Sequence, residues 1–168
     1  LQVQVYSRFF EHVGRSGIEL GDLFVSSDGW NPFGAGPNHV LDDAVTGEDW
    51  EYAFVLDDHG EGLPGETSMV GASGAFNVYD VFDKGIELST LTSDFRKGQE
   101  VQYNPVEIQT GLFQKPITAG KWKISENGDY DVLTMVVPLF FKPAGEMGFH
   151  WTMTCANDVI EGGYNPVP

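Results

Sequence analysis

Apolar and polar residues alternate along several short stretches of this chain, with the two-residue period of a β-strand that has one face in a core. The longest alternation covers residues 149–155, where large apolar side chains are separated by polar ones. The period stops after this segment, where Asn157 and Asp158 supply turn-forming side chains. We therefore predict a strand over residues 149–155 and a chain that leaves the core through Gly162 and Gly163.

The same pattern, together with enrichment in β-branched and aromatic residues, predicts further strands. They lie at residues 1–10, 18–26, 50–56, 75–82, 86–91, 100–103, 108–113, 122–125 and 130–141. Gly21 marks an expected bulge in the second of these strands, and Asn127-Gly128 marks a hairpin turn before the last. No stretch has a helical period. About nine or ten short strands of this kind predict an all-β fold, a two-sheet antiparallel β-sandwich that is jelly-roll-like.

The chain has 25 acidic and 9 basic residues and a formal net charge of −16 at pH 7. Such a surface repels phosphate backbones and anionic lipids, so we expect no nucleic-acid partner. The single cysteine, Cys155, cannot form an internal disulfide, and no Cys/His spacing is typical of a zinc site. The longest apolar run, residues 132–141, contains Pro138 and has about half the length that spans a bilayer, so we expect no membrane span in this chain.

Two segments carry a family resemblance. The ending HWTMTCANDVIEGG (150–163), followed by a short Gly/Asn spacer and Val167-Pro168, resembles the end of the exported region of bacterial PEP-CTERM proteins. Residues 17–37 and 48–56 are similar to a recurring segment in the same exosortase-sorted proteins. The resemblance implies that residues 164–168 are a spacer leading to a Val-Pro-Glu-Pro sorting signal. The length of the chain, 168 residues, independently predicts a single domain over residues 1–163.

In that family the sorting system is associated with cells that produce exopolysaccharide and form biofilms or flocs. The resemblance therefore implies a secreted, non-enzymatic structural protein of the bacterial cell surface or extracellular matrix, with exopolysaccharide as a candidate partner. The chain begins at Leu1 without a methionine or a charged leader, which fits a mature product whose signal peptide has been removed.

The first ten residues suggest how such a protein could polymerise. Residues 1–10 contain no proline or glycine, and their apolar positions include Val3, Val5 and Phe9. A terminal strand of this kind either lies at the edge of its own sheet or completes the sheet of a neighbouring molecule. The sharper hypothesis is a homopolymeric filament that is joined by N-terminal strand exchange.

A second function class is a carbohydrate-binding sandwich module with a structural calcium ion. Trp30 and Trp50 would offer flat faces to sugar rings, although Trp30 could equally hold its own glycine-rich loop onto the core. Nine acidic residues fall between positions 42 and 66. Ca²⁺ prefers such oxygen ligands, and Asp57, Asp58 and Glu61 are the candidates, unless the region is a solvated acidic loop.

The third class is a glycan or ester hydrolase. The four histidines, His12, His39, His59 and His150, are scattered along the chain, and no sequence motif of a nucleophilic or metal-dependent enzyme is present. A chain with 25 acidic residues will bring some carboxylates together by chance, so their number is not evidence for a glycosidase. We therefore predict no catalytic residue and expect that the protein is not an enzyme.

Overall fold

The computed structural model describes residues 1–29, 50–81, 107–108, 115–154 and 159–165. The described residues form eight β-strands and two short 3₁₀ helices, and no α-helix is found among them. The strands are β1 (Gln2–Ser7), β2 (Leu20–Ser26), β3 (Tyr52–Leu56), β4 (Ser73–Asp80), β5 (Thr118–Asn127), β6 (Tyr130–Val136), β7 (Met147–Met153) and β8 (Val159–Tyr164). The helices are η1 (Phe9–Glu11) and η2 (Arg15–Gly17). None of the described helices could cross a membrane.

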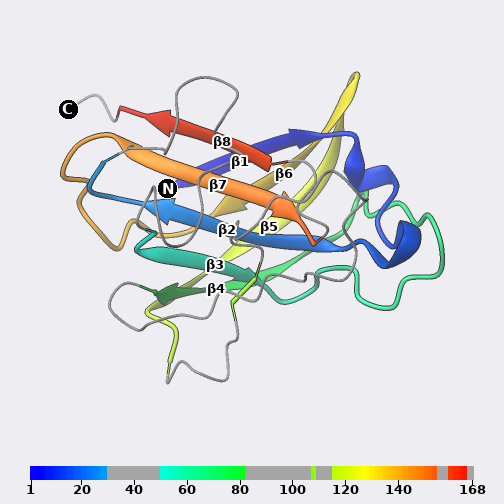
Figure 1. The fold of residues 1–168 in the computed structure, drawn as a ribbon, viewed down its shortest axis with the longest axis horizontal. Coiled ribbons are helices and arrows are strands. Elements are labelled where there is room, and N and C mark those ends of the chain that lie inside the picture. The colour runs from blue at the N-terminus through cyan, green and yellow to red at the C-terminus, as the bar shows by residue number, and fades with distance from the viewer. Residues whose placement is uncertain (30–49, 82–106, 109–114, 155–158, 166–168) are drawn as a thin grey trace, which may run out of the picture.

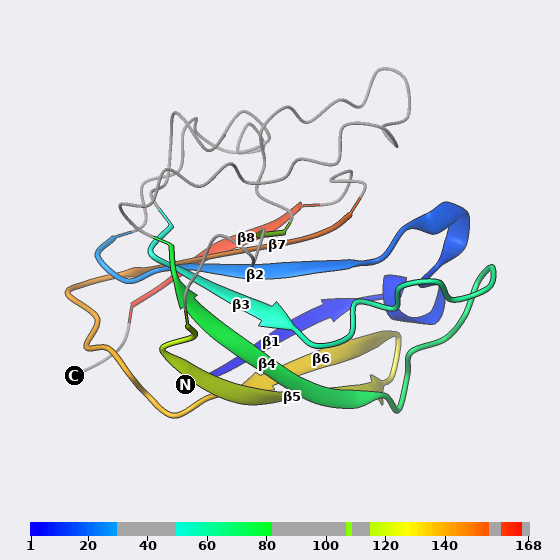
Figure 2. The ribbon, with the colours of Figure 1, turned by 90° about the horizontal axis from the view of Figure 1, so that it is seen from below.

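All eight strands belong to one sheet, in the order β1-β6-β5-β4-β3-β2-β7-β8, and every neighbouring pair is antiparallel. The sheet curls like a half-barrel, so that its two ends approach each other (Figures 1 and 2). The prediction of an all-β antiparallel fold is confirmed, but a two-sheet sandwich is not. The two halves are continuous because β3 and β4 pair from Tyr52↔Asp80 to Leu56↔Phe76.

The main core fills the concave side of the curled sheet. Large side chains from nearly every strand are fully buried there, including Trp151 from β7, Leu133 from β6 and Phe76 from β4. Phe10, from η1, also packs into this core, with its ring 5.7 Å from that of Trp151. The N-terminal segment therefore helps to build the core.

A second, smaller apolar cluster covers part of the opposite face of the sheet. It contains Phe24, Ala53, Tyr79, Val81 and Ile108. On β7, the polar residues His150 and Thr152 are fully buried on this side. The prediction that β7 has only one face in a core is therefore wrong, because its polar face is covered as well as its apolar one.

Local turn chemistry was predicted more accurately than the ends of the strands. The Asn127-Gly128 hairpin joins β5 and β6, with Gly128 at a φ of 68°. The bulge predicted at Gly21 coincides with a register shift between Leu20 and Leu23 where β2 pairs with β7. The strand expected over residues 1–10 ends at Ser7.

Several other expectations differ from the structure or lie beyond it. The strand expected over residues 130–141 ends at Val136, before Pro138. The sequence pattern does not predict the last strand, β8, because Gly162 and Gly163 are typical of a chain that leaves the core. The strands expected at residues 86–91 and 100–103 lie outside the described residues, as does Cys155.

Candidate functional site

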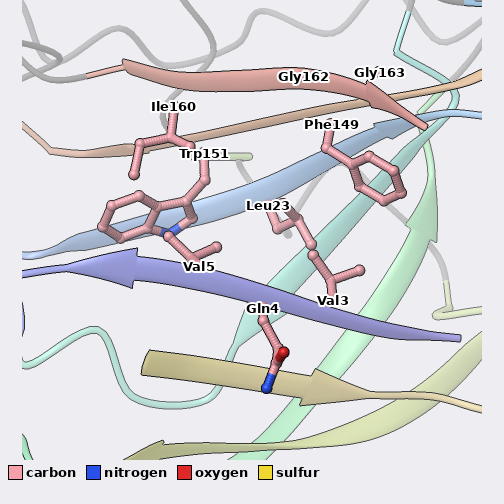
Figure 3. Close-up of a pocket in the computed structure, with 9 residues that line it drawn as sticks. All are labelled: Val3, Gln4, Val5, Leu23, Phe149, Trp151, Ile160, Gly162 and Gly163. Atoms are coloured by element: carbon pink, nitrogen blue, oxygen red, sulfur yellow. The ribbon is translucent and has the colours of Figure 1, made fainter. Parts of the chain in front are cut away.

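The two edges of the sheet, β1 and β8, line opposite sides of an apolar groove of about 230 Å³ (Figure 3). Val3 and Val5 of β1 point toward the groove, whereas Gln4 points away from it. The groove is lined by Val3, Gln4, Val5, Leu23, Phe149, Trp151, Ile160, Gly162 and Gly163. Two of the three residues predicted for an assembly strand, Val3 and Val5, thus lie in the groove.

The third predicted assembly residue, Phe9, lies in η1 rather than in β1 and packs against the main core. Val5 is also nearly buried, with 5% of its surface exposed. In the single chain β1 pairs with its own β6 along its whole length, from Gln2↔Val136 to Ser7↔Asp131. The inner edge of β1 is therefore occupied, and no strand among the described residues pairs with its outer edge.

The hydrogen-bond pattern shows which backbone groups form that open edge. Leu1 and Val137 exchange two backbone hydrogen bonds, of 2.9 and 3.0 Å, so they form a hydrogen-bonded pair. In an antiparallel ladder such pairs alternate with pairs whose N–H and C=O groups point away from the partner strand. The backbone groups of Gln2, Gln4 and Tyr6 consequently point outward.

Exposed apolar side chains gather near the same two edges. Tyr6 on β1 is 48% exposed, and Ile160 and Tyr164 on β8 are 39% and 57% exposed. Neither strand contains a proline or a lysine, and the only charged residue in either is Glu161. Natural proteins usually protect exposed edges with charges, prolines or bulges. These two edges have little such protection.

A second feature of the fold is a polar pocket of about 360 Å³ beside the smaller apolar cluster. Its wall combines residues of β2, β3 and β4 with the loop after β3. It is lined by Asp22, Val55, Leu56, Asp57, His59, Glu61, Asn77, Tyr79, Glu107 and Ile108. Four acids and one histidine therefore share one small space.

Asp22 and His59 form a close pair at the base of this pocket. The Nε2 atom of His59 lies 2.8 Å from Oδ1 of Asp22, and the backbone N–H of Ile108 donates to Oδ2 at 3.1 Å. Asp22 is fully buried, and burial raises the pKa of its carboxyl above the ordinary value despite the hydrogen bonds from His59, Ile108 and Leu56. These hydrogen bonds favour the carboxylate form and so oppose the effect of burial; when Asp22 is ionised, Nε2 of His59 is the donor in the contact between them.

Burial and the charges of the pocket also act on the pKa values of His59 and Glu107. Burial alone would lower the pKa of His59, but the hydrogen bond and negative charge of Asp22, with smaller contributions from Glu107 and Glu61, raise it. Burial raises the pKa of Glu107 to about 7; the charge of His59 opposes this, and neighbouring acids add to it. The pKa values of both groups are therefore raised, which favours their protonated forms near neutral pH.

These raised pKa values predict a protein that is more stable in mildly acidic solution. A group whose pKa is higher in the folded chain contributes stability at low pH and loses it as the pH rises through the folded pKa. For Glu107 this window runs from 4.5 to about 7, and for His59 it begins at 6.5. We expect the urea midpoint to be higher at about pH 5 than at about pH 8, with Glu107 contributing on the order of 1 kcal/mol after solvent screening.

Glu107→Gln should flatten this pH dependence and raise the midpoint at the alkaline end, because the amide cannot acquire a buried charge. The matched control is Glu126→Gln, which changes an exposed carboxylate of β5 and should keep the wild-type difference. A wild-type midpoint that increases from the acidic to the alkaline solution would contradict the prediction.

Of the three acids predicted to bind calcium, Asp57 and Glu61 both line the polar pocket, whereas Asp58 is not among its lining residues. Asp57 accepts hydrogen bonds from Nε1 of Trp122 at 2.8 Å and from the backbone of Ala75 at 2.9 Å. Asp58 caps the backbone N–H of Gly60 at 2.8 Å, and Glu61 lines the polar pocket. Within the described part of the chain, no three acidic, histidine or cysteine side chains are grouped to hold a metal ion. Asp57 and Asp58 thus have structural roles here.

Of the two predicted sugar platforms, only Trp50 lies within the described residues. Trp30 lies outside the described residues. Trp50 is half-buried, packs against the smaller apolar cluster and has its ring 5.6 Å from that of His150. The sequence analysis instead missed Asp22 and Glu107 as site residues. The one local signal for Asp22 was the adjacent Gly21 bulge, since bulges often occur beside functional sites.

Comparison with known proteins identifies no relative: no family model, no curated protein and no solved structure matches this chain.

Proposed function

We propose that this protein is an exported structural component of a bacterial cell surface or extracellular matrix, and that its copies assemble through their sheet edges. The resemblance of residues 150–163 and 17–37 to PEP-CTERM proteins supports the extracellular location and makes exopolysaccharide the candidate non-protein partner. The observation that carries the assembly is the pair of open, weakly protected edges, β1 and β8.

The strand count favours head-to-tail contact. In an antiparallel sheet with an even number of strands, the two edge strands run in opposite directions. With eight strands, β1 of one copy and β8 of an equally oriented copy are therefore antiparallel, which is the more favourable pairing. Such a contact joins two different surfaces and leaves a free edge at each end, so it generates open filaments unless the rotation closes a ring.

Gln4→Pro tests this contact. Proline removes the backbone N–H of residue 4, which points outward, and leaves the backbone hydrogen bonds between β1 and β6 in place. We expect folded monomers from this variant and filaments from the wild type, as seen by negative-stain electron microscopy and sedimentation velocity. Gln4→Thr is the matched control, since it loses the same side-chain amide but keeps the N–H, and it should assemble normally.

Two results would overturn the proposal: a wild-type protein that stays monomeric at high concentration, or a Gln4→Pro variant that still forms the wild-type assemblies by edge pairing.

Strand exchange is the competing route to assembly, and a cross-link between β1 and β6 distinguishes it from edge pairing. Gln4 and Thr134 form a non-hydrogen-bonded pair, so the double variant Gln4→Cys/Thr134→Cys can fasten β1 to its own β6. With the disulfide formed, the variant should still assemble by edge pairing. Assembly by exchange of the N-terminal strand would instead occur only after the disulfide is reduced.

A further inference from the structure

The polar pocket takes no part in the proposed assembly. It lies beside the smaller apolar cluster, whereas the groove between β1 and β8 is lined by residues of the main core. Its central feature is the 2.8 Å contact between His59 and Asp22. Both oxygens of Asp22 accept hydrogen bonds, and its side chain is only 1% exposed, so this carboxylate is held in one orientation. Asp22 in turn fixes the ring of His59.

This contact also sets the tautomer of the histidine. When Nε2 carries the proton that is donated to Asp22, the lone pair of neutral His59 is on Nδ1. A carboxylate that orients an imidazole in this way is a recurring arrangement in general-base catalysis. The side chain of His59 is 12% exposed, so it lies at the pocket wall and not deep in a core.

Glu107 supplies the second half of an acid–base pair. It lines the same pocket, and its charge interacts with those of His59 and Asp22. Its pKa of about 7 means that a large fraction of this carboxyl is protonated at neutral pH. A general acid is most effective when its pKa is close to the working pH. Two groups with opposite roles thus line one cavity, as in other acid–base enzymes.

The charge of the wall indicates which reaction the pocket would favour. Of the described residues that line it, four are acids and none is a lysine or arginine. An ester is hydrolysed through an oxyanion, which these carboxylates would repel. A glycosidic bond is hydrolysed through a transition state with positive charge on the sugar ring, which they would stabilise. The volume of about 360 Å³ is within the range of small-ligand sites.

We propose that this pocket hydrolyses a glycosidic bond of an uncharged sugar, with Glu107 as the general acid and His59 as the general base. Glu107 donates its proton to the leaving oxygen while the bond from that oxygen to the anomeric carbon breaks. His59 takes a proton from a water molecule whose oxygen bonds to the same carbon. The products are an alcohol and a sugar hemiacetal, and the proton on His59 returns to Glu107 through solvent. Asp22 is a positioning residue.

This activity departs from the expectation that the protein is not an enzyme, and it is independent of the proposed assembly. The test uses a panel of neutral glycosides in two matched series, methyl and dinitrophenyl, with nitrophenyl acetate as the ester comparison. Dinitrophenolate leaves without protonation, whereas methoxide requires it. We therefore expect Glu107→Gln to lose about 100-fold or more in kcat on the methyl glycosides but less than about 10-fold on the dinitrophenyl glycosides.

Two further variants separate the roles. His59→Gln should lose activity on both series, because it removes the base. Asp22→Asn should move the acidic limb of the pH–rate profile to lower pH, because His59 loses the negative charge that raises its pKa. The exposed-site control Glu126→Gln should match the wild type throughout. Circular dichroism of each variant reports whether the fold is retained.

The proposal is overturned if the wild type turns over none of the glycosides across the neutral pH range, or if it hydrolyses the ester but no glycoside. It is equally overturned if Glu107→Gln, while folded, loses both glycoside series to the same extent. That last result would mean that Glu107 supports the structure of the pocket and not the departure of the leaving group.

Discussion

Gly120→Ala is expected to lower the free energy of unfolding by roughly 2–4 kcal/mol, because a methyl group at this position has no space. A Cβ atom on Gly120 would overlap the ring of Phe76 and lie 2.5 Å from the carbonyl oxygen of Val136. Phe76 cannot move away easily. Its side chain is fully buried, and its ring stacks on that of Phe54 with 5.2 Å between the ring centres.

The matched control is Gly162→Ala on the edge strand β8. No atom lies within 4 Å of a Cβ built at Gly162, so this change should alter stability by less than about 1 kcal/mol. Both variants can be compared by urea unfolding followed by tryptophan fluorescence. Equal losses of stability in the two variants would contradict the prediction. They would mean that the close contact between Gly120 and the ring of Phe76 contributes nothing specific to stability.

The same arrangement occurs a second time on the adjacent strand. Gly74 of β4 pairs with Trp122 of β5, just as Gly120 of β5 pairs with Phe76 of β4. A Cβ atom on Gly74 would lie only 2.7 Å from Nε1 of Trp122. Each aromatic ring thus lies over the glycine opposite it. Glycines at such positions let a sheet bend sharply, and the covering rings replace the packing that they lack.

The two glycine–aromatic pairs between β4 and β5 show what the prediction of a two-sheet sandwich lacked. The alternating pattern predicts most of the described strands, although not the burial of both faces of β7, and the Asn127-Gly128 turn fixes one hairpin. The pattern does not say whether consecutive strands stay in one sheet. That depends on cross-strand pairs such as Phe76 with Gly120, whose members lie 44 residues apart in the chain, and no local period reports them.

The same limit applies to the polar pocket. His59 lies 37 residues after Asp22, and the backbone of Ile108 that completes the pair lies 86 residues after it. The bulge at Gly21 marks the neighbourhood of Asp22, but nothing local indicates that His59 is its partner. By contrast, the groove was partly predictable. The alternation of glutamine and valine correctly put Val3 and Val5 on one face of β1, although it did not indicate that the groove's other side would be β8.

The edge strands and the pocket also make different demands on the fold. Edge assembly depends on backbone groups that point outward from β1, so single side-chain changes on the convex face should affect it little. The pocket depends on side chains of the central strands β2, β3 and β4, on His59 in the loop after β3, and on Glu107. Variants of the edge strand β1 can therefore serve as controls in experiments on the polar pocket, and variants of the pocket as controls in experiments on assembly.

Phe10→Ala is expected to cost about 3–5 kcal/mol, since it would leave a large cavity beside Trp151 in the main core. That is a large part of the 5–15 kcal/mol that typically stabilises a domain. Phe9→Ala is the natural control, because Phe9 is only partly buried and its loss should cost about 1 kcal/mol. Urea unfolding of the monomeric Gln4→Pro background measures both without interference from assembly.

The comparison also decides how the N-terminal segment behaves before assembly. If the segment packs in the free subunit as it does here, removing residues 1–10 would delete Phe10 together with β1, and the product would unfold without revealing anything about assembly. A point change at the outer edge of β1 is then the informative one. If Phe10→Ala instead costs no more than Phe9→Ala, the segment is not anchored in the free subunit, and strand exchange becomes the better account of how copies join.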